Sequence, residues 1–168
     1  FFNAYEAVSE ALRKASTVLC YILVVFVTSE IGIAVFFRYV LNNPIQWAEE
    51  VARYTLIWLT MLAASIAIKT RAHISLTTLV DRFPKRVSLI LEIFLYVIIE
   101  VIIILIVRSS MIMVLARSVN IYSPSIAISM VWPQSALPAG FALIVIQAFY
   151  IILEDVKALI DGGSEQVP

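Results

Sequence analysis

The sequence predicts an all-α integral membrane protein with four transmembrane helices in a single domain, residues 1–168. The first observation is composition: 62% of the residues are hydrophobic, 14% are charged, and the mean hydropathy is +0.98. Soluble domains average about half apolar and a quarter charged residues. The second observation is length, because a helix needs about 20 mostly apolar residues to cross the hydrocarbon core. Four segments meet this requirement: 15–39, 50–68, 87–116 and 132–153.

An amphipathic stretch precedes the first apolar segment. One helical face would carry Phe1, Tyr5, Val8 and Leu12, and the other would carry Glu6, Glu10 and Arg13. This pattern predicts a short amphipathic N-terminal helix on the membrane surface, or a cytosolic extension of the first span. The apolar run that follows is longer than that of a signal peptide and has no small-residue cleavage site after it, so we expect an uncleaved helix.

The three connections carry clear turn signals. Residues 41–44, with two asparagines and a proline, end the first helix; Phe83 and Pro84 interrupt the second connection; and residues 118–124 begin the third. The third apolar segment is longer than a perpendicular crossing requires, so this helix should tilt or project from the membrane.

The fourth segment contains two prolines with different expected effects. Pro133 suits the first turn of a helix, where its missing N–H costs nothing, and Ser129 is a candidate cap upstream. Pro138 lies inside the helix and should bend it, because proline removes a backbone hydrogen bond and its ring crowds the preceding turn.

The distribution of positive residues predicts the orientation. Four crossings place both termini and the second connection on one side, and Lys and Arg are retained in the cytoplasm. That side holds eight such residues and the other holds three, so we expect both termini to be cytoplasmic. The two sets are Arg13, Lys14, Lys69, Arg71, Arg82, Lys85, Arg86 and Lys157, against Arg38, Arg53 and Arg117.

Four charged residues fall inside the apolar segments: Glu30, Glu92, Glu100 and Arg108. Each costs about 2.5 to 3.5 kcal/mol at the bilayer centre on insertion scales, so each should have a partner or a cavity. They could form an ion or proton relay. We instead expect structural pairing between helices or with another subunit, because no second carboxylate lies one turn from any of these acids.

The start of the second helix is rich in charge. Glu49 and Glu50 complement the positive end of the helix dipole, and both can reach Arg53 at spacings of four and three residues. Trp47 and Tyr54 flank them as expected interfacial anchors. The plainer interpretation is that these charged residues form a solvated helix cap. The functional interpretation is that they contact a partner protein.

Pairs of small residues at four-residue spacing occur in three of the segments, at Thr28 and Gly32, Ala63 and Ala67, and Ala136 and Gly140. Such pairs let helices approach closely in a membrane, so we interpret them as packing positions.

Nothing in the sequence supports catalysis. His73 is the only histidine, so paired haem ligands are missing and a catalytic metal site is unsupported. We interpret His73 as a cap near the end of the second helix. The serines in the spans have no histidine base nearby, and no glycine-rich phosphate loop is present. We therefore expect no enzyme activity and no cofactor, and the net charge of zero gives no sign of a nucleic-acid partner.

The middle of the chain, residues 38–86, resembles the small, DctQ-like subunit of tripartite ATP-independent periplasmic (TRAP) transporters. In that pattern an arginine ends the first helix, a proline and a tryptophan precede acids that open the second helix, and a basic segment with a histidine follows. The matching positions are Arg38, Pro44, Trp47, Glu49, Glu50, Arg71, His73 and Asp81, with a weaker match at Trp132, Pro133 and Pro138.

The resemblance implies a non-catalytic subunit of a secondary transporter in a bacterial inner membrane. Its implied partners are a large membrane subunit, a periplasmic substrate-binding protein and membrane lipid. In that family the large subunit holds the substrate and the sodium ions, and the small subunit packs against its stationary scaffold. Substrates are carboxylates such as sialic acid or C4-dicarboxylates, taken up by symport.

Two other functions fit four transmembrane helices. A self-contained small multidrug exporter also carries a carboxylate in its first helix, as Glu30 is here, and a membrane anchor for an unrelated complex needs no chemistry. The first would transport by itself, and the second would purify with a different partner.

Overall fold

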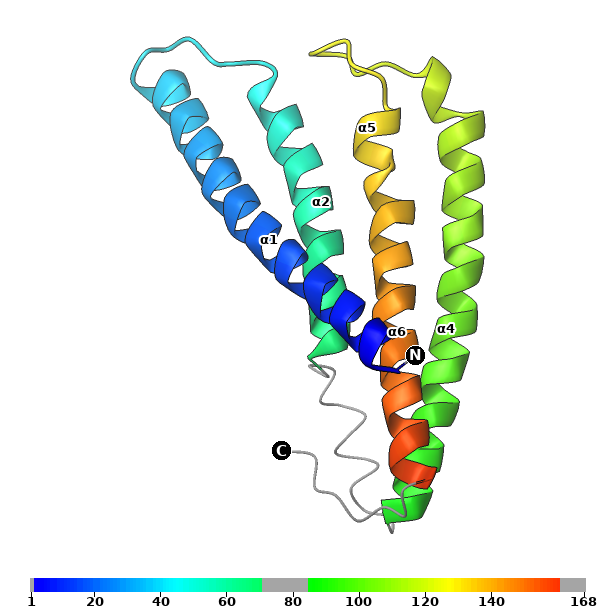
Figure 1. Ribbon diagram of the computed structural model, residues 1–168. Coiled ribbons are helices and arrows are strands. Elements are labelled where there is room, and N and C mark those ends of the chain that lie inside the picture. The colour runs from blue at the N-terminus through cyan, green and yellow to red at the C-terminus, as the bar shows by residue number, and fades with distance from the viewer. Residues whose placement is uncertain (1, 71–84, 161–168) are drawn as a thin grey trace.

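The computed structural model describes residues 2–70 and 85–160, which form long helices joined at one end by short connections (Figure 1). Four long helices are present in these ranges, together with two short ones. They are α1 (Phe2–Tyr39), α2 (Ala48–Lys69), α4 (Lys85–Ala116), η1 (Ser118–Asn120), α5 (Val131–Gln134) and α6 (Ala136–Ile160).

Four membrane spans are confirmed by length and hydropathy: Tyr5–Tyr39, Ala48–Lys69, Ile90–Asn120 and Val131–Lys157. The cores of these spans agree with the apolar segments of the sequence. The helices extend beyond those segments, because a helix continues until a turn signal stops it and not where its hydropathy falls.

The helices stand in an open row, in the order α1, α2, α6, α4 (Figure 1). Each helix packs along its neighbour in this row, and within the described ranges α4 packs against neither α1 nor α2. The outer helices are therefore exposed. Only 6% of the most apolar stretch of the first span is buried, against 44% of that of the fourth. Such apolar surfaces require lipid or a protein partner to cover them.

The amphipathic N-terminal stretch is continuous with the first span, since α1 runs unbroken from Phe2 to Tyr39. This agrees with the expectation of an extension of that span. The first turns of α1 cross α6, where the hydroxyl of Tyr5 donates a hydrogen bond to the backbone oxygen of Ile146 at 2.8 Å. From there α1 runs along α2 to the other end of the molecule, where the α1–α2 connection lies (Figure 1).

The fourth span is interrupted at Ser135, between α5 and α6. The interruption lies one turn before Pro138, which cannot donate a hydrogen bond to the backbone oxygen of Gln134. Pro138 therefore lies in the first turn of α6 and not inside a continuous helix, and the bend expected there stays a prediction. Pro133 lies in the first turn, as expected. The N-cap of α5 is Met130 and not the candidate Ser129, whose hydroxyl oxygen accepts a long hydrogen bond of 3.4 Å from the backbone N–H of Val131.

The best-packed part of the structure lies along α6, which packs against both α2 and α4. Its buried apolar side chains are Ile68, Tyr96, Ile103, Ile144, Ala148, Tyr150 and Ile151. Farther along α6, Gly140 lies against Met61 of α2, and a Cβ atom at this glycine would come within 2.4 Å of the Met61 Cβ. The expected close packing at Gly140 is thus confirmed, whereas Gly32 on α1 has no such neighbour within 4 Å.

Candidate functional site

An ion pair joins the end of α1 to the start of α2. Arg38 lies in the last turn of α1 and donates a hydrogen bond from its guanidinium to the carboxylate of Glu49. Between them the chain reverses through Asn42, whose φ of 51° is in the left-handed region that asparagine tolerates. Both charged side chains are exposed. The pair therefore fixes the tip of the α1–α2 hairpin while leaving its charges accessible.

Glu50 is the buried neighbour of this pair, with 8% of its surface exposed. Its carboxylate accepts a hydrogen bond from the hydroxyl of Tyr54, one turn farther along α2. Its second oxygen accepts from the backbone N–H of Ser125 at 3.1 Å. Glu50 therefore fastens the start of α2 to the connection between α4 and α5.

That connection has an ordered shape of its own. Tyr122 and Ser129 form an antiparallel bridge, and the backbone N–H of Ser123 donates to the oxygen of Ile128 at 2.8 Å. Ala127 turns the chain with a φ of 57°. The Glu50 carboxylate thus joins this connection to the first turn of α2.

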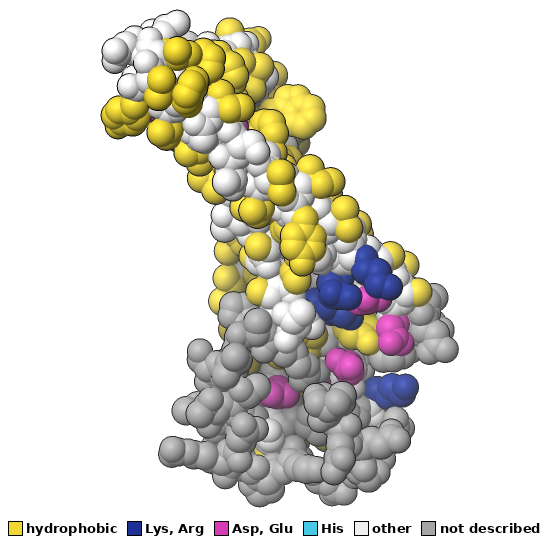
Figure 2. Space-filling view, turned by 90° about the vertical axis from the view of Figure 1, so that its left-hand side faces the viewer, with side chains coloured by type: hydrophobic (Ala, Val, Ile, Leu, Met, Phe, Trp, Pro, Cys, Tyr) yellow, Lys and Arg dark blue, Asp and Glu magenta, His cyan; other side chains and the backbone are white. Residues whose placement is uncertain are grey.

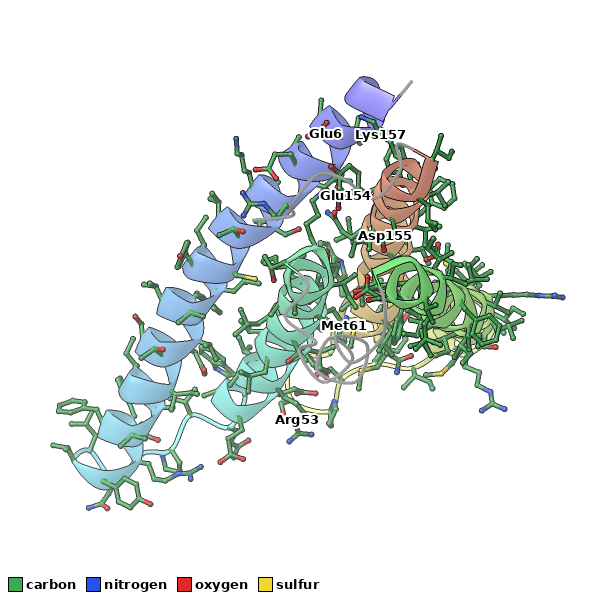
Figure 3. The ribbon with its side chains drawn as sticks, turned by 90° about the horizontal axis from the view of Figure 1, so that it is seen from below. Glu6, Arg53, Met61, Glu154, Asp155 and Lys157 are labelled. Atoms are coloured by element: carbon green, nitrogen blue, oxygen red, sulfur yellow. The ribbon has the colours of Figure 1, made fainter. Side chains whose placement is uncertain are left out.

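The expected pairing of both acids with Arg53 is wrong. Glu49 pairs with Arg38 and Glu50 with Tyr54, while Arg53 forms no ion pair within residues 2–70 and 85–160. Its side chain is exposed and points away from the row of helices (Figure 3). The helical spacing permitted the Arg53 pairs, but the folding of α1 alongside α2 supplied another cation.

Two tryptophans are exposed at the same end of the molecule. Trp47 directly precedes α2, and Trp132 lies in α5 with 71% of its surface exposed. Tryptophan prefers the interface between lipid and water, so these positions suit the membrane boundary or a partner protein.

A cleft between α1 and α2 contains Glu30. It has a volume of about 390 Å³. Its apolar lining residues are Ile31, Ala34, Val35, Ala48, Ala52 and Leu56, and the charged residues Arg38, Glu49 and Arg53 also border it. Both carboxylate oxygens of Glu30 are buried and accept no hydrogen bond from any described residue.

Two of the charged residues of α4, Glu100 and Arg108, are placed differently from each other. Glu100 faces the interior, with 9% of its surface exposed, and one of its carboxylate oxygens is buried without a donor among the described residues. Arg108 is exposed and forms no ion pair with a described residue. Pairing between helices or with another subunit was expected, and neither Glu100 nor Arg108 forms an ion pair with a described helix, so their pairing with another subunit stays a prediction. Arg108 remains open to a partner, whereas the interior position of Glu100 is poorly suited to one.

Charges also gather at the opposite end of the molecule, on the α1 side (Figure 2). Lys69 ends α2, and its ammonium group lies 3.1 Å from the ring centre of Tyr150 in α6. Glu6, Glu10 and Glu154 line a cavity of about 480 Å³ beside it. In the sequence Lys69 counts only toward the orientation, and no local pattern marks the aromatic ring of Tyr150 that lies under it.

His73, the expected cap, lies outside the described residues, as do Arg71 and Asp81 of the quoted pattern. In the described ranges, no three His, Cys, Asp or Glu side chains come together as a possible metal site.

A family profile described as "Tripartite ATP-independent periplasmic transporters, DctQ component" matches residues 30–158 of this chain. The sialic acid TRAP transporter small permease protein SiaQ of Vibrio cholerae is 28% identical over 131 residues, covering 76% of this chain and 73% of that protein. A Haemophilus influenzae protein whose name describes a TRAP transporter small permease is 32% identical over 79 residues, or 47% of this chain. The aligned part spans 49%, about half, of that Haemophilus relative.

A third relative matches over a short stretch only. The isethionate TRAP transporter permease protein DctMQ of Oleidesulfovibrio alaskensis is 45% identical over 40 residues, which is 24% of this chain and 6% of that protein.

Proposed function

This chain belongs to the DctQ component family of the tripartite ATP-independent periplasmic transporters, and from that premise we propose how it works as a small permease subunit. It supports the stationary scaffold of a large membrane subunit, which itself carries the substrate and sodium ions. The uptake substrate is an organic acid, such as sialic acid or a C4-dicarboxylate, delivered by a periplasmic binding protein. No cofactor or enzymatic step is part of this role.

The observation that carries the proposal is the open row of helices. A chain that translocated a solute by itself would need polar groups converging on a midplane site between its helices. Here the side chains buried where α2 and α4 pack against α6 are mainly apolar, with few buried polar groups such as Glu100, while α1 and α4 present long apolar faces outward. This shape suits a rigid slab that packs beside a larger membrane protein.

The comparisons support the partner and suggest substrates to try. A relative named DctMQ, of which the matched segment is 6%, is a much larger permease protein, and this supports a large partner for the present chain. The names of two relatives include sialic acid and isethionate, so both compounds belong in a panel of test substrates. Family membership favours this function over an independent exporter or an unrelated anchor.

The test is reconstitution of the whole transporter. The chain is co-expressed with the large subunit encoded for the same transporter, and the purified membrane complex is placed in liposomes with the binding protein outside. We expect sodium-gradient-driven uptake of one organic acid by the full set, and none by the small subunit alone. Gradient-driven transport by this chain alone would instead support the exporter, and failure to purify with the large subunit would refute the proposal.

A further inference from the structure

The cleft between α1 and α2 has an unusual content for a membrane protein. Small and apolar side chains line most of it, and one carboxylate, that of Glu30, has both oxygens buried in it. No described residue donates a hydrogen bond to either oxygen. A carboxylate shielded from water without a donor is unfavourable, so this arrangement points to a group that is supplied from outside the chain.

The two described cations that border the cleft, Arg38 and Arg53, do not pair with Glu30. Arg38 is engaged by Glu49, and it lies eight residues farther along α1, which is about 12 Å along the helix axis. Arg53 borders the cleft but points away from the helices (Figure 3). Neither forms an ion pair with Glu30.

A lipid headgroup is also a poor occupant, because of depth. Arg38 and Trp47 mark the polar end of the α1–α2 hairpin, where headgroups would lie. Glu30 is about two helical turns deeper than Arg38, in the zone of acyl chains. Acyl chains can fill the apolar lining but offer no hydrogen-bond donor.

We propose that the α1–α2 cleft receives a lysine or arginine side chain from a transmembrane helix of the large subunit, which pairs with Glu30. This inference rests on the proposed function, and it identifies one contact by which the small subunit binds the large subunit. Charge complementarity selects a cation, and Ala34, Ala48 and Ala52 leave the room for it. A cationic side chain on a transmembrane helix can lie at the depth of Glu30, whereas a lipid headgroup lies nearer the membrane surface.

Variants of Glu30 test the pairing in the complete complex. Glu30→Gln keeps the shape of the side chain and removes its charge, and Glu30→Lys opposes a cation. Ser29→Ala is the matched control, because Ser29 is the exposed neighbour and bonds only to the backbone oxygen of Val25. Each tagged small subunit is purified from membranes containing the large subunit, and the ratio of large to small subunit is measured.

We expect Glu30→Lys to lower this ratio by about tenfold or more, Glu30→Gln by a few-fold, and Ser29→Ala not at all. The melting temperature of the isolated Glu30→Gln subunit should not fall, which separates lost contact from misfolding. A lysine or arginine changed to glutamate in a membrane helix of the large subunit should restore complex formation with Glu30→Lys. A photo-reactive residue at Leu56, which lines the cleft, should crosslink to that same helix, whereas one at the exposed Leu105 of α4 should not.

Two results would overturn the inference: wild-type recovery of the large subunit by both Glu30 variants, or crosslinking from Leu56 to lipid alone. Either result leaves the proposed function standing, provided that the wild-type subunit recovers the large one. If the wild-type chain does not recover it, the proposed function itself fails.

Discussion

Ser9 and Gln147 are 138 residues apart in the chain and are joined by two buried hydrogen bonds. The Ser9 hydroxyl donates to the side-chain oxygen of Gln147 at 2.6 Å, and the Gln147 amide donates to the backbone oxygen of Ser9 at 3.1 Å. Neither residue has exposed surface, at 0% each. Together with the Tyr5 hydrogen bond to Ile146, this pair holds the first turns of α1 on α6.

Breaking the pair from one side should therefore destabilise the subunit. We expect Ser9→Ala or Gln147→Leu alone to cost about 1–3 kcal/mol of unfolding free energy, because the remaining group is left buried without a partner. The double variant should cost less than the sum of the two. Unfolding in mixed micelles, analysed as a double-mutant cycle, measures the coupling; additive losses would show that the two side chains act independently.

Gly140 and Gly32 should respond oppositely to alanine. At Gly140 an added Cβ meets the Met61 Cβ at 2.4 Å, so α2 and α6 must move apart, at a cost of about 1–3 kcal/mol. At Gly32 nothing lies within 4 Å, so alanine should be neutral or slightly stabilising in the isolated subunit through helix propensity. Thermal melts of both variants in the same detergent give the comparison, and equal behaviour would contradict the described α2–α6 approach.

The adjacent acids Glu49 and Glu50 also offer a matched pair. Glu49→Gln should leave stability almost unchanged, because its ion pair with Arg38 is exposed. Glu50→Gln should cost about 1–3 kcal/mol, since a buried acceptor for Tyr54 and for the Ser125 N–H is partly lost. Protease sensitivity of the 118–130 connection should rise only in the Glu50 variant. A larger effect from Glu49→Gln would show that the hairpin tip, and not the connection, depends on this charge.

Glu100 should be dispensable for stability. Its carboxylate is buried and has an oxygen without a donor among the described residues, so Glu100→Leu should raise the melting temperature of the isolated subunit. Glu100→Gln should be mild, whereas Glu100→Lys should reduce both stability and recovery of the complex. A clear loss of stability in Glu100→Leu would contradict this expectation.

The orientation can be tested by thiol labelling in a Cys20→Ser background. Single cysteines at Asn43 and Asn120, both exposed in the connections at one end, should react with a membrane-impermeant reagent in intact cells. A cysteine at Thr78, in the second connection, should react only after the membrane is opened. This follows from the excess of Lys and Arg on the side of the termini, and the reverse labelling pattern would invert the topology.

The sequence by itself determined the four membrane spans and their positions along the chain. Their lengths follow from the thickness of the hydrocarbon core, and proline and asparagine mark where α1 ends and where the fourth span is interrupted. These are local properties: each depends on residues within one or two helical turns. The quoted pattern from Arg38 onward is also continuous in sequence, so the family could be inferred from it before any fold was known.

Only the tertiary structure decided which charges meet. Helical spacing favoured Arg53 as the partner of Glu49, but Arg38 came closer once α1 folded back beside α2. Ser9 and Gln147 gave no signal, because neither a serine in an amphipathic stretch nor a lone glutamine in an apolar helix reveals which distant residue it contacts. The sequence also could not show that Glu30 lies in its cleft without a hydrogen-bond donor. A buried carboxylate with a hydrogen-bond donor and one without have the same local sequence. Such pairings depend on the crossing of distant helices, which is set by packing along their whole length and not by the residues next to the charge.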